Sequence, residues 1–520
     1  SYLKGPDIEK AHPHFRQNVS SLQLLVEALR NHGDATAVVE AQTGKSASFA
    51  DILQKSTTAA AGLQDAGVTA GDYVVFCCDK SILSYSLLLG VMFKGATAVL
   101  CPTGKASVIH LLTKGHDVKA AFYDKHFADP VRQSLDSMDS PPTLVAALDL
   151  EDPQMKAIFN SKAECSIYRV EDTEKHIPMI LFSSGTTGEP KGILLSDTAI
   201  TLMGVLFTPD VKLMFNASPF YWYTGSMCFI SAVLNKYTVI LSNAMSGDNL
   251  PLVQKYQPEG WFLSVGSMIQ CSHAENIESY DCSSVRIVVT GGEVVLEKVM
   301  KTFLDKVVGA DTSFLILYGI TEGGIIANTS SDDVTLLGKK LPPGVFLDLY
   351  PGVNIKILDE EGNPVAPGSL GEMWLKAVGM TPGYWSLPEL NRKVFDKDGY
   401  FCTGDAAFCD SRGVLFHRGR VDDLITYRGV KIPPAEIEEV LMSHPAVLEA
   451  AVIGRSHPVD TQHATAYVVR KPGVQVSEEE ISAFVDGQVD DLKRLRGGVH
   501  LVDGLPRIAI GKIIRKELRN

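Results

Sequence analysis

Hydrophobic residues along this chain gather in short runs that alternate with longer, helix-like stretches. The runs at residues 74–78 and 96–100 are rich in β-forming side chains, and the apolar stretch around residues 87–89 separates them. A further run at 238–241 follows a helical stretch at 228–234. Because strands that alternate with helices usually form a parallel sheet covered by those helices, this pattern predicts an α/β fold.

Two of the predicted strands lead directly into glycine-containing segments. The run at 286–290 ends at Gly291 and Gly292, which places this pair at the carboxyl end of a strand, where open α/β sheets bind their ligands. The run at 179–182 leads into residues 183–192, whose sequence is Ser-Ser-Gly-Thr-Thr-Gly-Glu-Pro-Lys-Gly.

Residues 183–192 have the composition of an anion-binding loop. The glycines permit a backbone that turns its N–H groups inward around an anion, the hydroxyls add donors and the lysine adds a positive charge. A plain surface linker, the alternative, needs neither a preceding buried strand nor a closing Pro-Lys-Gly. The spacing differs from that of the usual P-loop. The predicted phosphate ligands are Ser183, Ser184, Gly185, Thr186, Thr187, Gly188 and Lys191.

Composition narrows the class of protein. At 520 residues the chain is too long for one hydrophobic core, so two or more domains are expected. The 48 basic and 61 acidic residues give a net charge of -13, which argues against nucleic acid or an anionic membrane as the main partner. Nine cysteines without CxxC spacing are typical of reduced thiols in an intracellular protein.

The chain carries no recognisable export or membrane signal. Its most apolar region, residues 83–101, is interrupted by Gly90, Lys94 and Gly95, which favours a buried helix and strand over a transmembrane segment. The final residues lack the Ser-Lys-Leu signal of peroxisomal proteins. We therefore expect an intracellular protein, cytoplasmic or peroxisomal, whose oligomeric state stays open.

Residues 183–192 resemble the phosphate-binding signature of the adenylate-forming superfamily, which includes acyl- and aryl-CoA synthetases, beetle luciferases and peptide-synthetase adenylation domains. Further signatures follow in the family's order. Residues 318–322, Tyr-Gly-Ile-Thr-Glu, resemble the adenine and magnesium motif, and residues 403–405, Thr-Gly-Asp, the ribose motif. Residues 419–422, Gly-Arg-Val-Asp, resemble the hinge, and residues 506–512 the catalytic lysine loop.

The resemblance is to the acyl/aryl-CoA synthetase branch, similar to 4-coumarate-CoA ligase and beetle luciferase. It implies a large N-terminal multi-subdomain α/β domain at residues 1–418 and a small, mobile C-terminal α+β domain at 419–520. Asp422 would be the hinge. Members first form acyl-AMP, then rotate the small domain so that the lysine leaves and the segment carrying Arg428 and Gly429 helps to admit CoA.

The same resemblance assigns the other roles. Lys512 would bridge the substrate carboxylate and the α-phosphate, Thr321 would donate to that phosphate, and Glu322 would bind Mg²⁺. Two anions meet when a carboxylate attacks ATP, so such charge neutralisation is needed. The implied cofactors are ATP, Mg²⁺ and CoA. The remaining nucleotide contacts would be Gly291, Gly292, Glu293, Tyr318 and Gly319 around the adenine, and Asp405 and Arg420 at the ribose.

The acyl pocket is expected in the segment around Trp222 and beside Leu317. Trp222 stands where hydroxycinnamate ligases and beetle luciferases have a histidine, and Leu317 replaces a luciferase glycine, so both reduce the room for the acid. An aromatic cluster that only fills the core is the alternative, and the acid's identity stays open. The predicted pocket residues are Tyr221, Trp222, Tyr223, Thr224, Gly225 and Leu317.

The favoured function is an ATP-dependent carboxylic acid-CoA ligase that acts on a small-molecule acid. Thr426 stands where relatives commonly carry a lysine linked to the oxidative step of beetle luciferases, which puts beetle-type luminescence in doubt. A luciferase with another luciferin, a stand-alone adenylation enzyme and a non-catalytic nucleotide sensor remain as alternatives. The segment 219–225 contains no Asp to hold an amino group, and the presence of Lys512, Glu322 and Asp405 disfavours a sensor.

Overall fold

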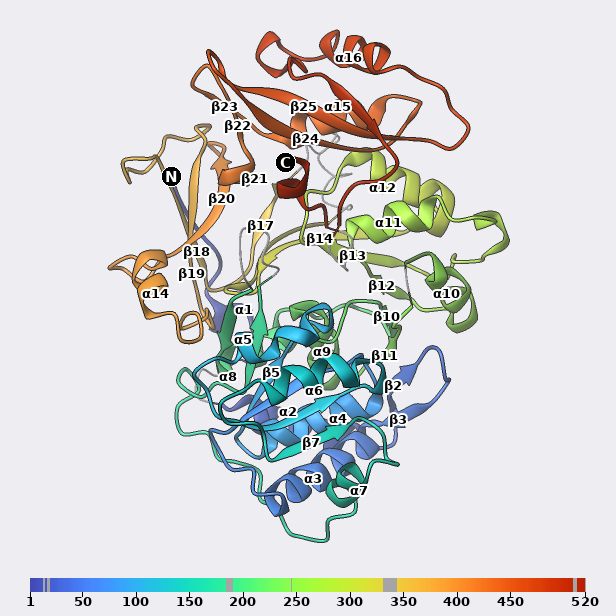
Figure 1. Cartoon of the computed structure of the whole chain (residues 1–520), viewed down its shortest axis with the longest axis vertical. Helices are drawn as coiled ribbons and strands as arrows, with labels where there is room; N and C mark the ends of the chain where they lie inside the picture. Colours follow the sequence, from blue (N-terminus) through green and yellow to red (C-terminus); the bar gives the residue numbers. More distant parts are fainter. Residues whose placement is uncertain are drawn as a thin grey trace.

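The computed structural model describes residues 1–12, 15, 19–183, 190–244, 246–330, 344–507 and 512–519. The described residues form four β-sheets with helices packed around them (Figure 1). No helix in this part of the chain is both long and apolar enough to cross a membrane.

The first sheet contains the strand–helix–strand unit that the sequence predicts. Its strands are parallel except for the last pair, which flanks the predicted phosphate loop. Helix α4 (Ile82–Phe93) is apolar on all sides and almost fully buried, and Ser81 caps its first turn. In spatial order the strands are β7 (Leu144–Ala147), β6 (Val118–Tyr123), β4 (Tyr73–Cys77), β5 (Thr97–Leu100), β8 (Met179–Phe182) and β9 (Gly192–Leu195).

The second sheet is the largest, and six of its nine strands run parallel. The largest core cluster joins it to the first sheet through helices that both sheets share, α3, α4 and α9 among them. The strands, in order, are β17 (Asp348–Leu349), β15 (Gly324–Ser330), β14 (Ser313–Ile320), β13 (Ile287–Gly291), β12 (Gly260–Phe262), β10 (Leu213–Asn216), β11 (Thr238–Leu241), β2 (Thr36–Glu40) and β3 (Ser46–Ser48).

The third sheet is antiparallel and includes the N-terminal residues of the chain, because β1 pairs with β18. Its strands are β1 (Tyr2–Lys4), β18 (Val353–Leu358), β19 (Gly371–Ala377), β20 (Phe401–Cys409), β21 (Leu415–Arg420) and β16 (Val345–Phe346). The 3-10 turn Val421–Asp423 follows β21 and leads into the C-terminal part of the molecule.

The C-terminal part has its own sheet, which lies at the top of Figure 1 in orange and red. Its final segment returns toward α12 and β14 of the large part. The five strands are β23 (Val430–Ile432), β22 (Ile425–Tyr427), β25 (Thr461–Arg470), β24 (Val447–His457) and β26 (Val499–Val502). The predicted domain boundary at residues 418 and 419 stays a prediction, and β21 crosses it as one strand.

Helices cover the sheets throughout the described chain. Those longer than one turn are α2 (Ser21–His32), α3 (Phe49–Asp65), α4, α6 (Ala128–Asp136), α7 (Pro153–Phe159), α8 (Asp197–Val205), α9 (Tyr223–Asn235), α10 (Leu250–Tyr256), α11 (Val265–Ser272), α12 (Glu297–Phe303), α14 (Pro388–Val394), α15 (Pro434–Ser443) and α16 (Glu478–Asp486); α1 (Ile8–Ala11) and α5 (Ile109–Leu112) are single turns.

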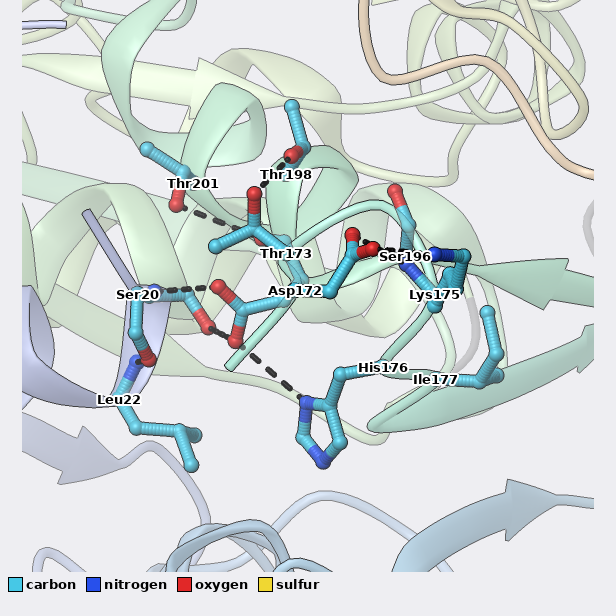
Figure 2. Close-up of polar contacts among 12 residues, drawn as sticks. Ser20, Leu22, Asp172, Thr173, Lys175, His176, Ile177, Ser196, Thr198 and Thr201 are labelled. Carbon is cyan, nitrogen blue, oxygen red and sulfur yellow. Dashed lines mark hydrogen bonds and ion pairs between the residues drawn. The ribbon is translucent and has the colours of Figure 1, made fainter. Parts of the chain in front are cut away.

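A buried polar cluster fixes the segment that leads into β8 and the predicted phosphate loop. Asp197, fully buried at the start of α8, accepts 2.7 Å hydrogen bonds from the backbone N–H and the hydroxyl of Ser21. The backbone N–H of Asp197 donates to the carbonyl of His176, and the Thr198 hydroxyl donates to the Thr173 hydroxyl. In Figure 2 the side chains of Thr173 and Thr198 face each other, and the His176 ring lies on the opposite side of the group. The cluster therefore joins α2, α8 and the segment that leads into β8.

Candidate active site

A cavity of about 620 Å³ lies between the large part of the molecule and its C-terminal part. The carboxyl ends of β13 and β14 form one wall, β21 forms another, and α15 and residues 512–515 complete it from the C-terminal side. Carboxyl ends of parallel strands are the usual ligand-binding edge of an α/β sheet. Of the predicted site residues, the cavity is lined by Gly292, Glu293, Leu317, Tyr318, Gly319, Asp405, Arg420 and Lys512.

Antiparallel pairing brings the predicted ribose residues together. Asp405 of β20 is the register partner of Arg420 of β21, and the guanidinium donates a 3.2 Å hydrogen bond to Asp405 Oδ1. The phenol of Tyr318 donates to the other carboxylate oxygen at 2.6 Å. Gly404 has φ +68°, which favours glycine, and a Cβ there would lie 2.6 Å from Arg420 Nη2. Three signatures far apart in sequence thus form one polar cluster.

His417 completes this cluster, although it belongs to none of the predicted motifs. Its ring lies 4.8 Å from the Tyr318 ring, and its Nε2 lies 3.6 Å from Asp405 Oδ1. Burial opposes ionisation of Asp405, but His417, Arg420 and Tyr318 outweigh it and lower the pKa of this carboxyl. Asp405 is therefore a carboxylate with two well-placed oxygens. Only the register of β20 and β21 places the histidine here, so no local sequence signal could have found it.

Gly291 ends β13, and Gly292 and Glu293 follow it, which places the glycine pair at the carboxyl end of the strand as predicted. Gly291 pairs with Leu317 of β14, and a Cβ on Gly291 would lie 2.3 Å from the Leu317 carbonyl oxygen. Gly292 has φ +86°, a conformation that glycine adopts readily. The two glycines therefore allow the chain to turn tightly beside Tyr318, while Glu293 extends toward the C-terminal segment.

Lys512 reaches the same cavity from the C-terminal part. Ile513, the next residue, donates its backbone N–H to Glu293 Oε1 at 3.2 Å. Two arginines of this segment have carboxylate partners of their own at 2.7 Å, Arg515 with Glu438 and Arg507 with Glu449. The cavity wall thus carries three cations on its C-terminal side, and two of them are paired with carboxylates that also line the cavity.

Glu322 is linked to the predicted phosphate loop through Tyr384, a contact that the sequence analysis did not predict. The Tyr384 hydroxyl donates to Glu322 Oε1 at 2.7 Å, and the Lys191 ammonium lies 5.9 Å from the centre of the Tyr384 ring. Burial raises the pKa of Glu322, so a cation would stabilise its carboxylate form.

The ends of the phosphate loop are held together. The Ser183 N–H donates to the Lys191 carbonyl at 2.9 Å, and the Lys191 N–H donates to the Ser183 hydroxyl at 3.0 Å. Ser184, Gly185, Thr186, Thr187 and Gly188 lie outside the described residues. Of the predicted phosphate loop, the structure therefore describes only the two ends.

The predicted acyl segment lies at the start of α9. A Cβ at Gly225 would lie 2.0 Å from the carbonyl oxygen of Pro219, so only glycine fits there. The Tyr223 hydroxyl lies close to Gly324, the first residue of β15, since a Cβ at Gly324 would lie 2.9 Å from it. Tyr223 and Thr321 also line a second, much smaller cavity. Tyr221, Trp222 and Thr224 do not line the large cavity, whereas Leu317 does.

Arg428 and Gly429 form the turn between β22 and β23, away from the large cavity. Both have positive φ, +49° and +80°. The Arg428 side chain donates to Asp460 Oδ1 at 2.7 Å. This hydrogen bond holds the guanidinium against the turn between β24 and β25, where Asp460 lies. Asp422 lies in the 3-10 turn between the two parts of the molecule, where its carbonyl accepts a hydrogen bond from Arg519. In this arrangement Lys512, and not Arg428, faces the cavity.

The described residues form a two-part α/β protein with a cavity between a large N-terminal part and a smaller C-terminal part. The chain belongs to the AMP-binding enzyme family, whose model matches residues 25–385. The model of the AMP-binding enzyme C-terminal domain matches residues 436–512. The predicted family and fold class are thereby confirmed.

Similar proteins cover nearly the whole chain. The 4-coumarate-CoA ligase-like protein 3 of Arabidopsis thaliana is 28% identical over 93% of this chain and 89% of its own length. A phenylacetyl-CoA ligase of Aspergillus niger is 27% identical over 92% of each chain. Among solved structures, ATP-bound MatB of Rhodopseudomonas palustris has a TM-score of 0.83 and 23% identity, covering 96% of this chain and 98% of MatB. The anthranilate CoA ligase AuaEII with anthranoyl-AMP has a TM-score of 0.86 and 22% identity over 98% of each chain.

Proposed function

We propose that this protein is an ATP-dependent carboxylic acid-CoA ligase. The observation that carries the proposal is that Lys512, from the C-terminal part, lines the same cavity as Tyr318, Asp405 and Arg420. The similar proteins include a phenylacetyl-CoA ligase and a 4-coumarate-CoA ligase-like protein, which supports the same reaction class.

In the first half-reaction a carboxylate oxygen attacks the α-phosphorus of ATP, and pyrophosphate leaves. Two anions must approach each other, so the reaction needs fixed positive charge that does not reorganise. Lys512 supplies it in our proposal, with Lys191 at the end of the phosphate loop. Asp405 is suited to the ribose because a carboxylate accepts hydrogen bonds from both hydroxyls of a vicinal diol.

The residues around Glu322 fit a Mg²⁺ ion. Its carboxylate is oriented by Tyr384 and destabilised by burial, two features that a hard cation would exploit. We propose that Glu322 holds the metal that accompanies the triphosphate and that Thr321 donates to the α-phosphate. When bound, Mg²⁺ supplies charge neutralisation of the phosphates.

In the second half-reaction the CoA thiol attacks the acyl carbonyl, loses its proton, and AMP leaves. Arg428 and Gly429 lie outside the cavity in the present arrangement. We therefore propose that the structure corresponds to the adenylation arrangement and that rotation about Asp422 brings this turn to the cavity for thioester formation. The carbonyl of Asp422 is anchored by Arg519 on one side of that pivot.

The acid pocket is proposed to lie between Leu317 and the segment 221–225. Leu317 lines the cavity and Tyr223 packs beside Thr321, so the acid would extend from the α-phosphate toward the start of α9. Bulky side chains here favour small or medium acids over bicyclic ones. Trp222, the first residue before the helix, would close the far end.

A panel of straight-chain and aromatic acids, each with ATP and Mg²⁺, tests the proposal. We expect acid-dependent pyrophosphate release, and acyl-CoA with AMP only when CoA is added. Acyl-AMP that does not react with CoA would instead indicate a stand-alone adenylation enzyme, and light emission with a luciferin and oxygen would indicate a luciferase. If no acid gave pyrophosphate release, the protein would not have this activity, and a non-catalytic nucleotide sensor would be indicated.

A further inference from the structure

Glu293 connects the two parts of the molecule directly beside Lys512. It follows β13 in the large part, and its Oε1 accepts the backbone N–H of Ile513, which belongs to the C-terminal segment. Both Glu293 and Ile513 line the large cavity. This hydrogen bond can exist only while the C-terminal segment lies against the cavity.

The charges around Glu293 come from the same segment. Burial raises the pKa of this carboxyl, and Lys512, Arg515 and Arg507 act in the opposite direction. Arg515 and Arg507 are already paired with Glu438 and Glu449. The salt bridges found among the described residues of this segment involve Arg515 and Arg507, whereas Lys512 acts on Glu293 through its charge.

We propose that Glu293 is a positioning residue that docks the Lys512 segment onto the cavity for the first half-reaction. The inference rests on the proposed function. A desolvated carboxylate is costly unless it is hydrogen-bonded and faces cations. Departure of the C-terminal segment would remove the Ile513 N–H and the three cations together. The free energy of this contact therefore favours the arrangement in which Lys512 faces the α-phosphate.

Two variants separate docking from a simple adenine contact. Glu293→Ala removes the acceptor, and we expect the adenylation kcat to fall about 10- to 100-fold, the usual effect of losing a hydrogen bond to a charged group. Glu293→Gln keeps an acceptor oxygen for Ile513 and should lose less. The KM for ATP should change little in either variant. If Glu293 only contacted adenine, its replacement would instead raise the KM for ATP. Glu278→Gln, an exposed carboxylate outside the cavity, is the control.

Hydrogen–deuterium exchange over residues 512–519 gives a readout that needs no catalysis. Exchange should be faster in Glu293→Ala than in wild type and in Glu278→Gln, with Glu293→Gln between them. Equal exchange in all four proteins, or a rise in KM for ATP without a fall in kcat, would overturn the docking role. If the wild-type protein released no pyrophosphate with any acid, the proposed function would fail, while the exchange comparison would still decide on Glu293.

Discussion

Tyr318 and Asp405 are joined by a 2.6 Å hydrogen bond between the phenol and the carboxylate, although 87 residues separate them in sequence. The first residue belongs to the large, mostly parallel sheet and the second to the antiparallel sheet. Their contact therefore couples the two sheets at the wall of the cavity. It also leaves Asp405 ionised and oriented, as a group that binds a ribose must be.

Asp405→Asn should weaken AMP binding. The amide keeps the shape of the side chain but cannot accept on both atoms, so we expect a roughly 10- to 100-fold increase in Kd, measured by titration calorimetry. Asp410→Asn is the matched control, because Asp410 follows the same strand, pairs with Arg412 and does not line the cavity. An equal loss in both variants would show that the hairpin, and not the ribose contact, is affected.

Lys512→Ala should abolish adenylation and spare nucleotide binding. Removal of a charge aimed at the transition state typically lowers the rate by about 10²- to 10³-fold. Pyrophosphate release reports the first step, and acyl-CoA formation from supplied acyl-AMP reports the second. Lys516→Ala, four residues further along and outside the cavity lining, is the control. Equal losses in the two steps would contradict the assignment of Lys512 to adenylation.

Asp460 and Arg428 should depend on each other in thioester formation, so that losing either one slows the step to a similar extent. Asp460 accepts from the Arg428 side chain at 2.7 Å, and its pKa is lowered to about 2 by hydrogen bonds from His463 and Arg428. We expect Arg428→Ala and Asp460→Asn each to slow acyl-CoA formation from acyl-AMP, and the double variant to lose no more than the worse single one.

Adenylation should be unchanged in these three variants. Asp490→Asn, an exposed carboxylate on the same domain that pairs with Lys493, serves as the control. Strictly additive losses in the double variant would indicate independent roles for Arg428 and Asp460.

Lys80 should make stability depend on pH. Its ammonium donates to the Ser218 carbonyl, just before the acyl segment, and burial lowers its pKa to about 7. Between pH 7 and about 10 the unfolded chain holds a proton that the folded chain lacks, because an exposed lysine has a pKa of about 10.4. Stability relative to Lys80→Met should therefore rise by about 1.4 kcal/mol per pH unit in this window and stay level below pH 7.

Urea unfolding at several pH values measures this difference. The exposed Lys45→Met variant is the control and should show no such slope. Parallel curves for wild type and Lys80→Met would mean that Lys80 keeps its proton in the folded protein.

Continuous apolar runs predicted the buried parallel strands well. The run at 238–241 coincides with β11, and the run at 286–290 is offset from β13 by one residue at each end. Strands buried on both faces are apolar throughout, which makes them visible in the sequence. The short strand Tyr2–Lys4 was not predicted, since three residues carry no periodicity and its partner β18 lies some 350 residues away.

The site was predictable as far as its residues belong to local motifs. Tyr318, Asp405, Arg420 and Lys512 come together as the resemblance implied. His417, Tyr384 and the contact of Glu293 with Ile513 were not predicted, because they depend on strand register and on how two domains dock. Such long-range geometry leaves no mark in a single sequence.

The most direct test of the central claim follows oxygen from the acid to the nucleotide. With a substrate carboxylic acid labelled with ¹⁸O in both carboxyl oxygens, ATP and CoA, the reaction through acyl-AMP transfers one labelled oxygen to AMP, since the attacking carboxylate oxygen remains on the α-phosphorus. Mass spectrometry should find one ¹⁸O in AMP and none in pyrophosphate. Unlabelled AMP alongside acyl-CoA, or release of ADP and labelled phosphate, would show that the α-phosphorus is not attacked and would rule out an acyl-AMP intermediate.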